Sequence, residues 1–163
     1  MLSLKQKQSG FTIVELLIVI VIIGILAGLV ITTFVGIQAR GRDSERQTDI
    51  NAIQKQVEAY YAVNGAYPTA ANINSSAWRT GNKVQLDAKA LANPSNASTQ
   101  TLSGTAPNSS DDPYGYVATP SGCEASTDNT GASVTPASPG ACTGYTVSAW
   151  MEAKNEAYSQ QNQ

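Results

Sequence analysis

The chain has 163 residues, of which 13% are charged and 42% are apolar, and its formal net charge is −2. This length suits one modest domain with an appendage, and the slightly acidic balance argues against a protein that holds nucleic acid through a general basic field. The sequence has no histidine and two cysteines, which excludes the usual Ser-His-Asp and Cys-His catalytic arrangements and a Cys/His zinc site. We therefore expect a protein that is not an enzyme and needs no cofactor.

Residues 1–10 form a short polar segment with two lysines and no acidic residue. The 22 residues from Leu16 to Ile37 carry no charge, and a helix of about 20 such residues spans a bilayer core. Basic residues ahead of a membrane helix predict a cytoplasmic N-terminus. The apolar run is too long for an ordinary secretory signal, and no A-x-A site follows it. A processing site is therefore expected before the run, at Gly10-Phe11.

Helical character continues beyond the apolar run. A flank of balanced charge comes first, with three arginines and three acidic residues between Arg40 and Asp49. Five apolar residues then recur at steps of three and four, which predicts one apolar helical face: Ile50, Ile53, Val57, Tyr60 and Tyr61. Asn64-Gly65 is a typical helix end. We predict one helix from about Phe11 to about Val63, whose outer half needs a covering domain.

Residues 66–163 are predicted to form that covering domain. Three runs have the composition of strands, at 83–86, 114–118 and 143–151. The last is the strongest, because apolar residues occupy every second position from Tyr145 to Met151. Loops rich in Ser, Thr, Asn, Gly and Pro separate the runs, and the polar tail from Lys154 to Gln163 is predicted to be frayed. A small antiparallel sheet packed on the outer half of the helix predicts an α+β fold.

Cys123 and Cys142 are an isolated pair beyond a membrane segment. Such a pair favours one disulfide in an oxidising compartment. The bond would close a loop of about 20 residues, which is worth roughly 3 kcal/mol in the chain-entropy model. The alternative is two reduced, buried thiols.

The stretch SGFTIVELLIVIVIIGILAGL, from Ser9 to Leu29, resembles the start of type IV pilin and pseudopilin precursors. It has a basic leader that ends at Gly10, then Phe11, then Glu15 as the fifth residue after the break, and then a long apolar helix. The resemblance implies a pilin-like fold. It also implies that a prepilin peptidase cuts after Gly10 and methylates the new amine of Phe11, and that the subunit then leaves the membrane for a helical filament.

Glu15 is an acid at membrane depth, where an ionisable residue is a functional candidate that needs a partner. The resemblance implies that the partner is the cationic amine of Phe11 on a neighbouring subunit. Pairing would offset much of the cost of burying two charges, and it would set the subunit register, because a misaligned helix leaves both charges unpaired. The alternative is that Glu15 lies among the lipid headgroups and reaches water.

Two weaker patterns have competing interpretations. Gly24 and Gly28 have the spacing of a small-xxx-small helix contact, although interior glycines are also common in membrane helices. The stretch DDPYG, from Asp111 to Gly115, resembles a turn of the major secretion pseudopilins, in which a nearby loop can bind calcium. Asp111 and Asp112 offer hard oxygen ligands. The alternative is a proline turn that opens a strand.

These patterns divide the chain into a leader (1–10), a transmembrane and assembly helix (11–37), an amphipathic continuation (38–65) and a β-rich head domain (66–163). The resemblance implies that the partners are prepilin peptidase, the pilus assembly platform, the membrane and other copies of the subunit. No direct nucleic-acid site is evident. The implied location is the cytoplasmic membrane, with one pass and a cytoplasmic N-terminus, and then a cell-surface pilus.

The expected function is that of a structural subunit of a type IV pilus-like filament, serving adhesion, twitching motility or DNA uptake. One alternative is a pseudopilin of a type II secretion or competence machine. Another is a membrane-anchored extracellular binding protein, in which the helix is only an anchor.

Overall fold

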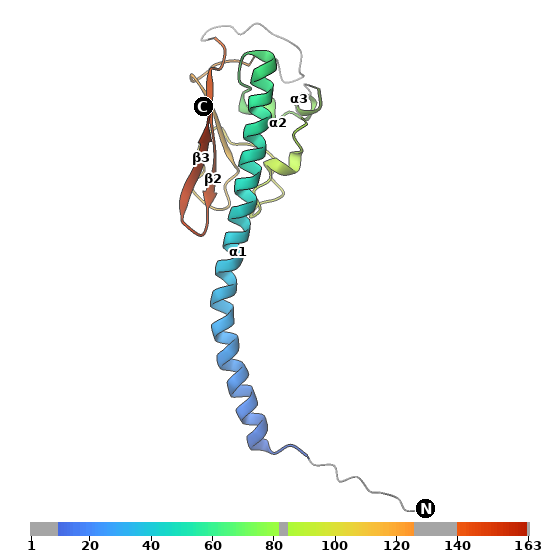
Figure 1. Ribbon diagram of the computed structural model, residues 1–163, viewed down its shortest axis with the longest axis vertical. Helices are drawn as coiled ribbons and strands as arrows, with labels where there is room; N and C mark the ends of the chain where they lie inside the picture. Colours follow the sequence, from blue (N-terminus) through green and yellow to red (C-terminus); the bar gives the residue numbers. More distant parts are fainter. Residues whose placement is uncertain (1–9, 82–84, 126–139, 163) are drawn as a thin grey trace, which may run out of the picture. The chain divides into compact units, whose positions relative to one another are not determined.

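A computed structural model describes residues 10–81, 85–125 and 140–162 (Figure 1). The chain divides into two units, Met1–Gln38 and Ala39–Gln163. The predicted α+β, pilin-like fold is confirmed, because one long N-terminal helix is followed by a small antiparallel sheet.

The long helix α1 spans Ile13–Asn64, which is 52 residues. This confirms the predicted helix to within two residues at its start and one at its end. Gly65 terminates it with a φ of 70°, and its N–H donates to the carbonyl oxygen of Tyr61 at 2.8 Å. Glycine adopts this left-handed conformation without strain, which explains why Asn64-Gly65 acts as the stop.

The part of α1 in the first unit exposes its apolar side chains. Every large apolar residue between Phe11 and Ile37 is at least half exposed, from 50% at Val21 to 86% at Phe11. The most apolar 18 residues of α1 are not buried in the protein. By length and composition the helix can cross a membrane. A surface of this kind calls for lipid or other helices to cover it.

The second unit contains an antiparallel sheet in the order β1-β2-β3. The strands are β1 (Gly115–Thr119), β2 (Gly144–Met151) and β3 (Glu156–Gln161). The strands predicted at 114–118 and 143–151 are thus confirmed to within one residue. The strand predicted at 83–86 lies half outside the described residues, and Gln85 and Leu86 are not in a strand.

The polar tail was predicted to be frayed, and that prediction is wrong. Residues 156–161 form β3, which pairs with the central strand from Thr146↔Gln161 to Met151↔Glu156. Four of its six side chains are exposed, so the strand has no hydrophobic pattern to reveal it. Its backbone bonds to β2 and the packing of Tyr158 against the core hold it in place.

One apolar core joins the second half of α1 to the sheet, and Figure 1 shows β2 and β3 running beside this half. The buried residues Ile50, Ile53, Val57 and Tyr60 line the helix side, which confirms four of the five residues of the predicted stripe. Tyr61 is the exception, at 40% exposed. Three short helices complete this unit: α2 (Ala70–Asn74), α3 (Ser76–Gly81) and the 3-10 helix η1 (Ala88–Leu91).

Cys123 and Cys142 form the predicted disulfide, with their Cα atoms 5.0 Å apart. An isolated bridge between Glu124 and Ala141 lies beside it. The carbonyl of Cys142 accepts from the N–H of Tyr67 at 2.9 Å. This hydrogen bond ties the segment that follows α1 to the disulfide and to the start of β2.

Gly115 begins β1 in close contact with its surroundings. A Cβ there would lie 2.5 Å from the carbonyl oxygen of Thr105 and 2.7 Å from Oγ of Ser148. We expect Gly115→Ala to lower the free energy of unfolding by about 1–3 kcal/mol, because overpacking forces the backbone to move. Thermal unfolding of the full chain in detergent, followed by near-UV circular dichroism, measures this. Gly104→Ala is the control, since a Cβ there meets nothing within 4 Å; equal melting temperatures for the two variants would contradict the expectation.

Candidate functional site

Glu15 lies in the first turn of α1, where Thr12 holds it. The N–H and Oγ1 of Thr12 both donate to Oε2 of Glu15 at 2.8 Å. In return, the N–H of Glu15 donates to Oγ1 of Thr12 at 3.2 Å. This is a capping box, in which the side chain of each residue accepts a hydrogen bond from the backbone N–H of the other. The negative charge is also favourable at the positive end of the helix dipole.

Thr12 is a site residue that the sequence reasoning missed, although the Thr-x-x-Glu signal was present at 12–15. The two residues before it, Gly10 and Phe11, are outside the helix and exposed. The structure thus brings Thr12 and Glu15 together. Gly10 and Phe11 lie immediately before the helix cap, exposed and outside the helix.

Gly24 and Gly28 lie on α1 one turn apart. A Cβ at either position would meet no atom within 4 Å. Within the described part of one chain, therefore, a larger residue would fit at either position without a clash. Any packing role for them needs a second helix.

A second polar cluster lies in the other unit, around Arg46. This side chain is fully buried, although the sequence analysis treated it only as one charge of a balanced flank. Its guanidinium donates to oxygens at 2.7 to 3.2 Å on five residues: Asp43, Asn93, Ser95, Ser110 and Glu152. A signal for this burial existed, because Asp43 and Arg46 continue the three-and-four spacing of the apolar stripe at Ile50.

Asp43 and Arg42 attach α1 to the turn between β2 and β3. The carboxylate of Asp43 accepts from the N–H groups of Glu152 and Ala153 at 2.8 and 2.9 Å. Arg42 donates to Oε2 of Glu152 at 2.6 Å. Burial alone would raise the pKa of Glu152, but hydrogen bonds from Arg42, Ser95 and Arg46 outweigh it and lower the pKa to about 2.

The DDPYG stretch forms a turn before β1. Oδ2 of Asp112 accepts from the N–H groups of Asn108 and Ser109 at 2.9 and 3.0 Å. The hydrogen bond from the Asn108 backbone is the main cause that lowers the pKa of Asp112. Asp112 therefore has a structural use in the turn. Across the described ranges, no group of three acidic or cysteine side chains is arranged to hold a metal.

Half-buried Asp49 on α1 pairs with buried Tyr114, which lies in the segment that leads into β1. The hydroxyl of Tyr114 donates to Oδ2 of Asp49 at 2.8 Å. Burial raises the pKa of Asp49 to about 6, against the opposing effect of this hydrogen bond. The ionised form of Asp49 is therefore less favourable in the folded chain than in the unfolded chain.

The N-terminal residues match a known family. Residues 5–31 match the family described as the prokaryotic N-terminal methylation motif. The chain is 40% identical over 65 residues to the type II secretion system core protein G of Aeromonas hydrophila, covering 40% of this chain and 46% of that protein. It is 34% identical over 88 residues to the type IV major pilin protein PilA of Myxococcus xanthus, covering 54% of this chain and 40% of that protein.

A third relative is the type II secretion system core protein G of Vibrio cholerae, 38% identical over 64 residues, covering 39% of this chain and 44% of that protein. The matches with these relatives span less than half the length of each of them. No solved structure matches the chain significantly.

Asp49 predicts a pH dependence of stability. Between about pH 4 and pH 6 the folded state binds more protons at this site than the unfolded state, so the free energy of unfolding should fall as the pH rises through this window. Asp49 is only half-buried, so we expect a change of about 1 kcal/mol rather than the ~3 kcal/mol that two pKa units carry. Denaturant unfolding of the full chain in detergent at several pH values measures it.

Asp49→Asn keeps an oxygen for Tyr114 but cannot titrate, so it should remove this slope. Asp111→Asn removes an exposed carboxylate and should retain it. A slope that survives in Asp49→Asn would show that another group causes it.

Proposed function

Because this chain carries the prokaryotic N-terminal methylation motif and is related to type IV pilins and type II secretion pseudopilins, we propose that it is a structural subunit of a filament built from its N-terminal helices. The observation that carries this proposal is the exposed apolar part of α1 that directly follows Gly10-Phe11 and the Thr12–Glu15 cap. The relatives belong to a structural family, not to a family of enzymes.

Processing comes first in the proposed sequence of events. A prepilin peptidase cuts the leader (1–10) after Gly10 and methylates the new amine of Phe11. Two observations support this assignment: both residues lie outside the helix and are exposed. A peptidase needs an extended, accessible peptide, and the Thr12 cap ensures that the helix starts only after the cleavage site.

Assembly then replaces lipid with other helices around residues 11–37. The mature subunit waits in the cytoplasmic membrane, with its N-terminus on the cytoplasmic side, until an assembly platform moves it into the filament. Gly24 and Gly28 allow neighbouring helices to approach closely, which suits packing without a hydrophobic driving force. The amphipathic continuation (38–65) and the head domain (66–163) form the filament surface.

Glu15 supplies the register of this packing. Thr12 engages only Oε2 of Glu15, and among the described residues no hydrogen bond reaches Oε1. Oε1 can accept a hydrogen bond from the cationic amine of Phe11 on the next subunit while the cap stays intact. Pairing of this kind offsets the cost of burying both charges and penalises a shifted helix.

Within this class, we favour a type IV pilus-like filament for adhesion, twitching motility or DNA uptake. A pseudopilin of a type II secretion or competence machine is the second candidate, because several relatives are type II secretion core proteins G. Electron microscopy of cells expressing the chain separates them: long surface fibres that contain this subunit support a pilus, and their absence supports a pseudopilin.

Mass spectrometry of sheared filaments tests the processing step. The expected result is a mature chain that starts at methylated Phe11. Cells that lack the prepilin peptidase are the control and should keep the leader. Filaments built from chains that still start at Met1 would contradict the proposal.

Variants of the cap test the assembly role of Glu15. Glu15→Ala should be cleaved and inserted but should give at most about a tenth of the wild-type filament yield, because a lost pair of this kind costs at least 1.4 kcal/mol per subunit. Glu15→Gln keeps an oxygen for Thr12 but has no charge, and it should fail equally. Thr12→Ala removes the cap but keeps the charge and should assemble. Normal yield from Glu15→Gln would assign Glu15 to capping alone.

A further inference from the structure

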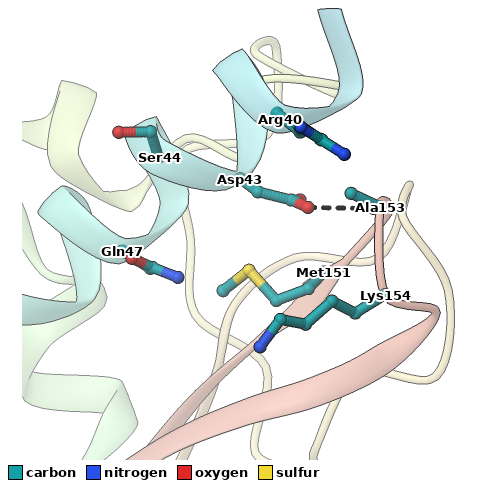
Figure 2. A pocket seen from close by; sticks show the side chains of 7 residues that line it. All are labelled: Arg40, Asp43, Ser44, Gln47, Met151, Ala153 and Lys154. Atoms are coloured by element: carbon teal, nitrogen blue, oxygen red, sulfur yellow. Dashed lines mark hydrogen bonds between the residues drawn. The ribbon is translucent and has the colours of Figure 1, made fainter. Parts of the chain in front are cut away.

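A pocket of about 410 Å³ lies between α1 and the turn that joins β2 to β3. Figure 2 shows Arg40 on the helix and Lys154 on the turn, on either side of Asp43, with Gln47 and Met151 lining the same hollow. All these residues belong to the second unit. The pocket is separate from the cap at Glu15 and takes no part in the function proposed above.

The charge available in this pocket is positive. The oxygens of its one acid, Asp43, are already used by Arg46 and by the N–H groups of Glu152 and Ala153. Arg40 is exposed, and no ion pair of its guanidinium occurs among the described residues. Lys154 has only a loose pair with Glu156 at 3.5 Å, in which both side chains are at least 60% exposed, and such pairs contribute little.

The remaining lining suits a phosphate diester. Ser44 offers a hydroxyl and Gln47 an amide, both neutral donors, beside the two cations. Guanidinium and ammonium groups bind phosphate oxygens through charge-assisted hydrogen bonds. Met151 gives an apolar floor for the carbon atoms next to such a phosphate.

The position of Arg40 along the helix indicates where this phosphate comes from. The uncharged run of α1 ends at Ile37, and Arg40 follows three residues later, or about 4.5 Å along the helix axis. When the apolar run lies in a bilayer, that distance places Arg40 in the headgroup layer rather than in bulk water. Soluble phosphate is not concentrated in the headgroup layer, whereas lipid phosphates are.

We propose that this pocket binds the headgroup phosphate of an anionic phospholipid while the subunit resides in the membrane. Arg40 and Lys154 contact the phosphate, and Ser44 and Gln47 bind the polar part of the headgroup. The bound lipid holds the second unit against the membrane surface and is released when the subunit is extracted. The inference rests on the membrane-resident stage of the proposed function.

Lipid selectivity of the full chain tests the pocket. The protein is reconstituted in phosphatidylcholine vesicles that contain spin-labelled phosphatidylglycerol or spin-labelled phosphatidylcholine, and electron paramagnetic resonance measures the immobilised fraction of each lipid. Wild type should prefer phosphatidylglycerol. Each cation near an anionic surface is worth about a fivefold change in association, so Arg40→Gln and Lys154→Gln should each reduce the preference by about that factor, and the double variant should nearly abolish it.

A matched control separates the pocket from general surface charge. Lys55→Gln with Lys89→Gln removes the same charge from exposed positions outside the pocket and should keep the preference. Equal losses in both double variants would overturn the inference. Release of the spin-labelled lipid by inorganic phosphate would also overturn it, because the pocket would then bind a soluble anion. Unchanged lipid selectivity of the pocket variant together with lost filament assembly would overturn it too, because the pocket would then be a contact between subunits.

Flotation of the vesicles distinguishes this inference from the function on which it depends. Protein that floats with the vesicles but shows no lipid preference overturns the pocket alone. Protein that does not float overturns both the pocket and the membrane-resident stage.

Discussion

The buried guanidinium of Arg46 is the interaction on which the second unit depends. A fully buried cation must be paired and hydrogen-bonded, since removing one partner from such a group costs about 3–5 kcal/mol. Its oxygen partners come from α1, from the loops around Asn93 and Ser110, and from the turn after β2. No local segment can satisfy it, so the helix, the loops and the sheet must come together in one arrangement.

A second polar contact acts twelve residues further along α1. The carboxylate of Glu58 accepts from the hydroxyl groups of Tyr67 and Tyr145 at 3.1 and 2.8 Å. Burial, and then Glu58 itself, raises the pKa of Tyr67 to about 12, so this tyrosine stays a donor. Between Arg46 and Glu58 the helix presents its apolar stripe to the sheet. Two directional contacts with apolar packing between them favour one position of the helix along the sheet.

The two parts of α1 differ in how their apolar side chains are exposed. Before Gln38 its apolar side chains are exposed. The one charged residue of this part, Glu15, lies in the first turn, where backbone N–H groups have no acceptor within the helix. Beyond Gln38 the same helix has a buried stripe and a charged face. One continuous helix therefore carries an exposed apolar surface in its first part and a stripe that packs into a folded domain in its second part.

Patterns that depend on near neighbours were readable from the sequence. The apolar run, the stop at Asn64-Gly65, the strand that ends at Met151 and the Gly10-Phe11-Glu15 motif each lie within a few residues or follow one period. The disulfide was also predicted, because an isolated cysteine pair beyond a membrane segment favours one bond in an oxidising compartment. The Thr12–Glu15 cap was readable too, although it was overlooked.

The amino-acid sequence by itself determined the long helix α1, the strands β1 and β2 and the N-terminal motif, because helix period, helix ends and strand alternation are set by nearby residues. Only the tertiary structure decided what Arg46, Asp43 and β3 do. Apart from the Asp43–Arg46 pair, their partners lie 47 to 110 residues away or are backbone groups of another strand. The spacing that continues the stripe to Asp43 and Arg46 indicates their burial but does not identify these distant partners. The pocket between Arg40 and Lys154 has the same origin, since it exists only because the β2–β3 turn is held against α1 by those distant contacts.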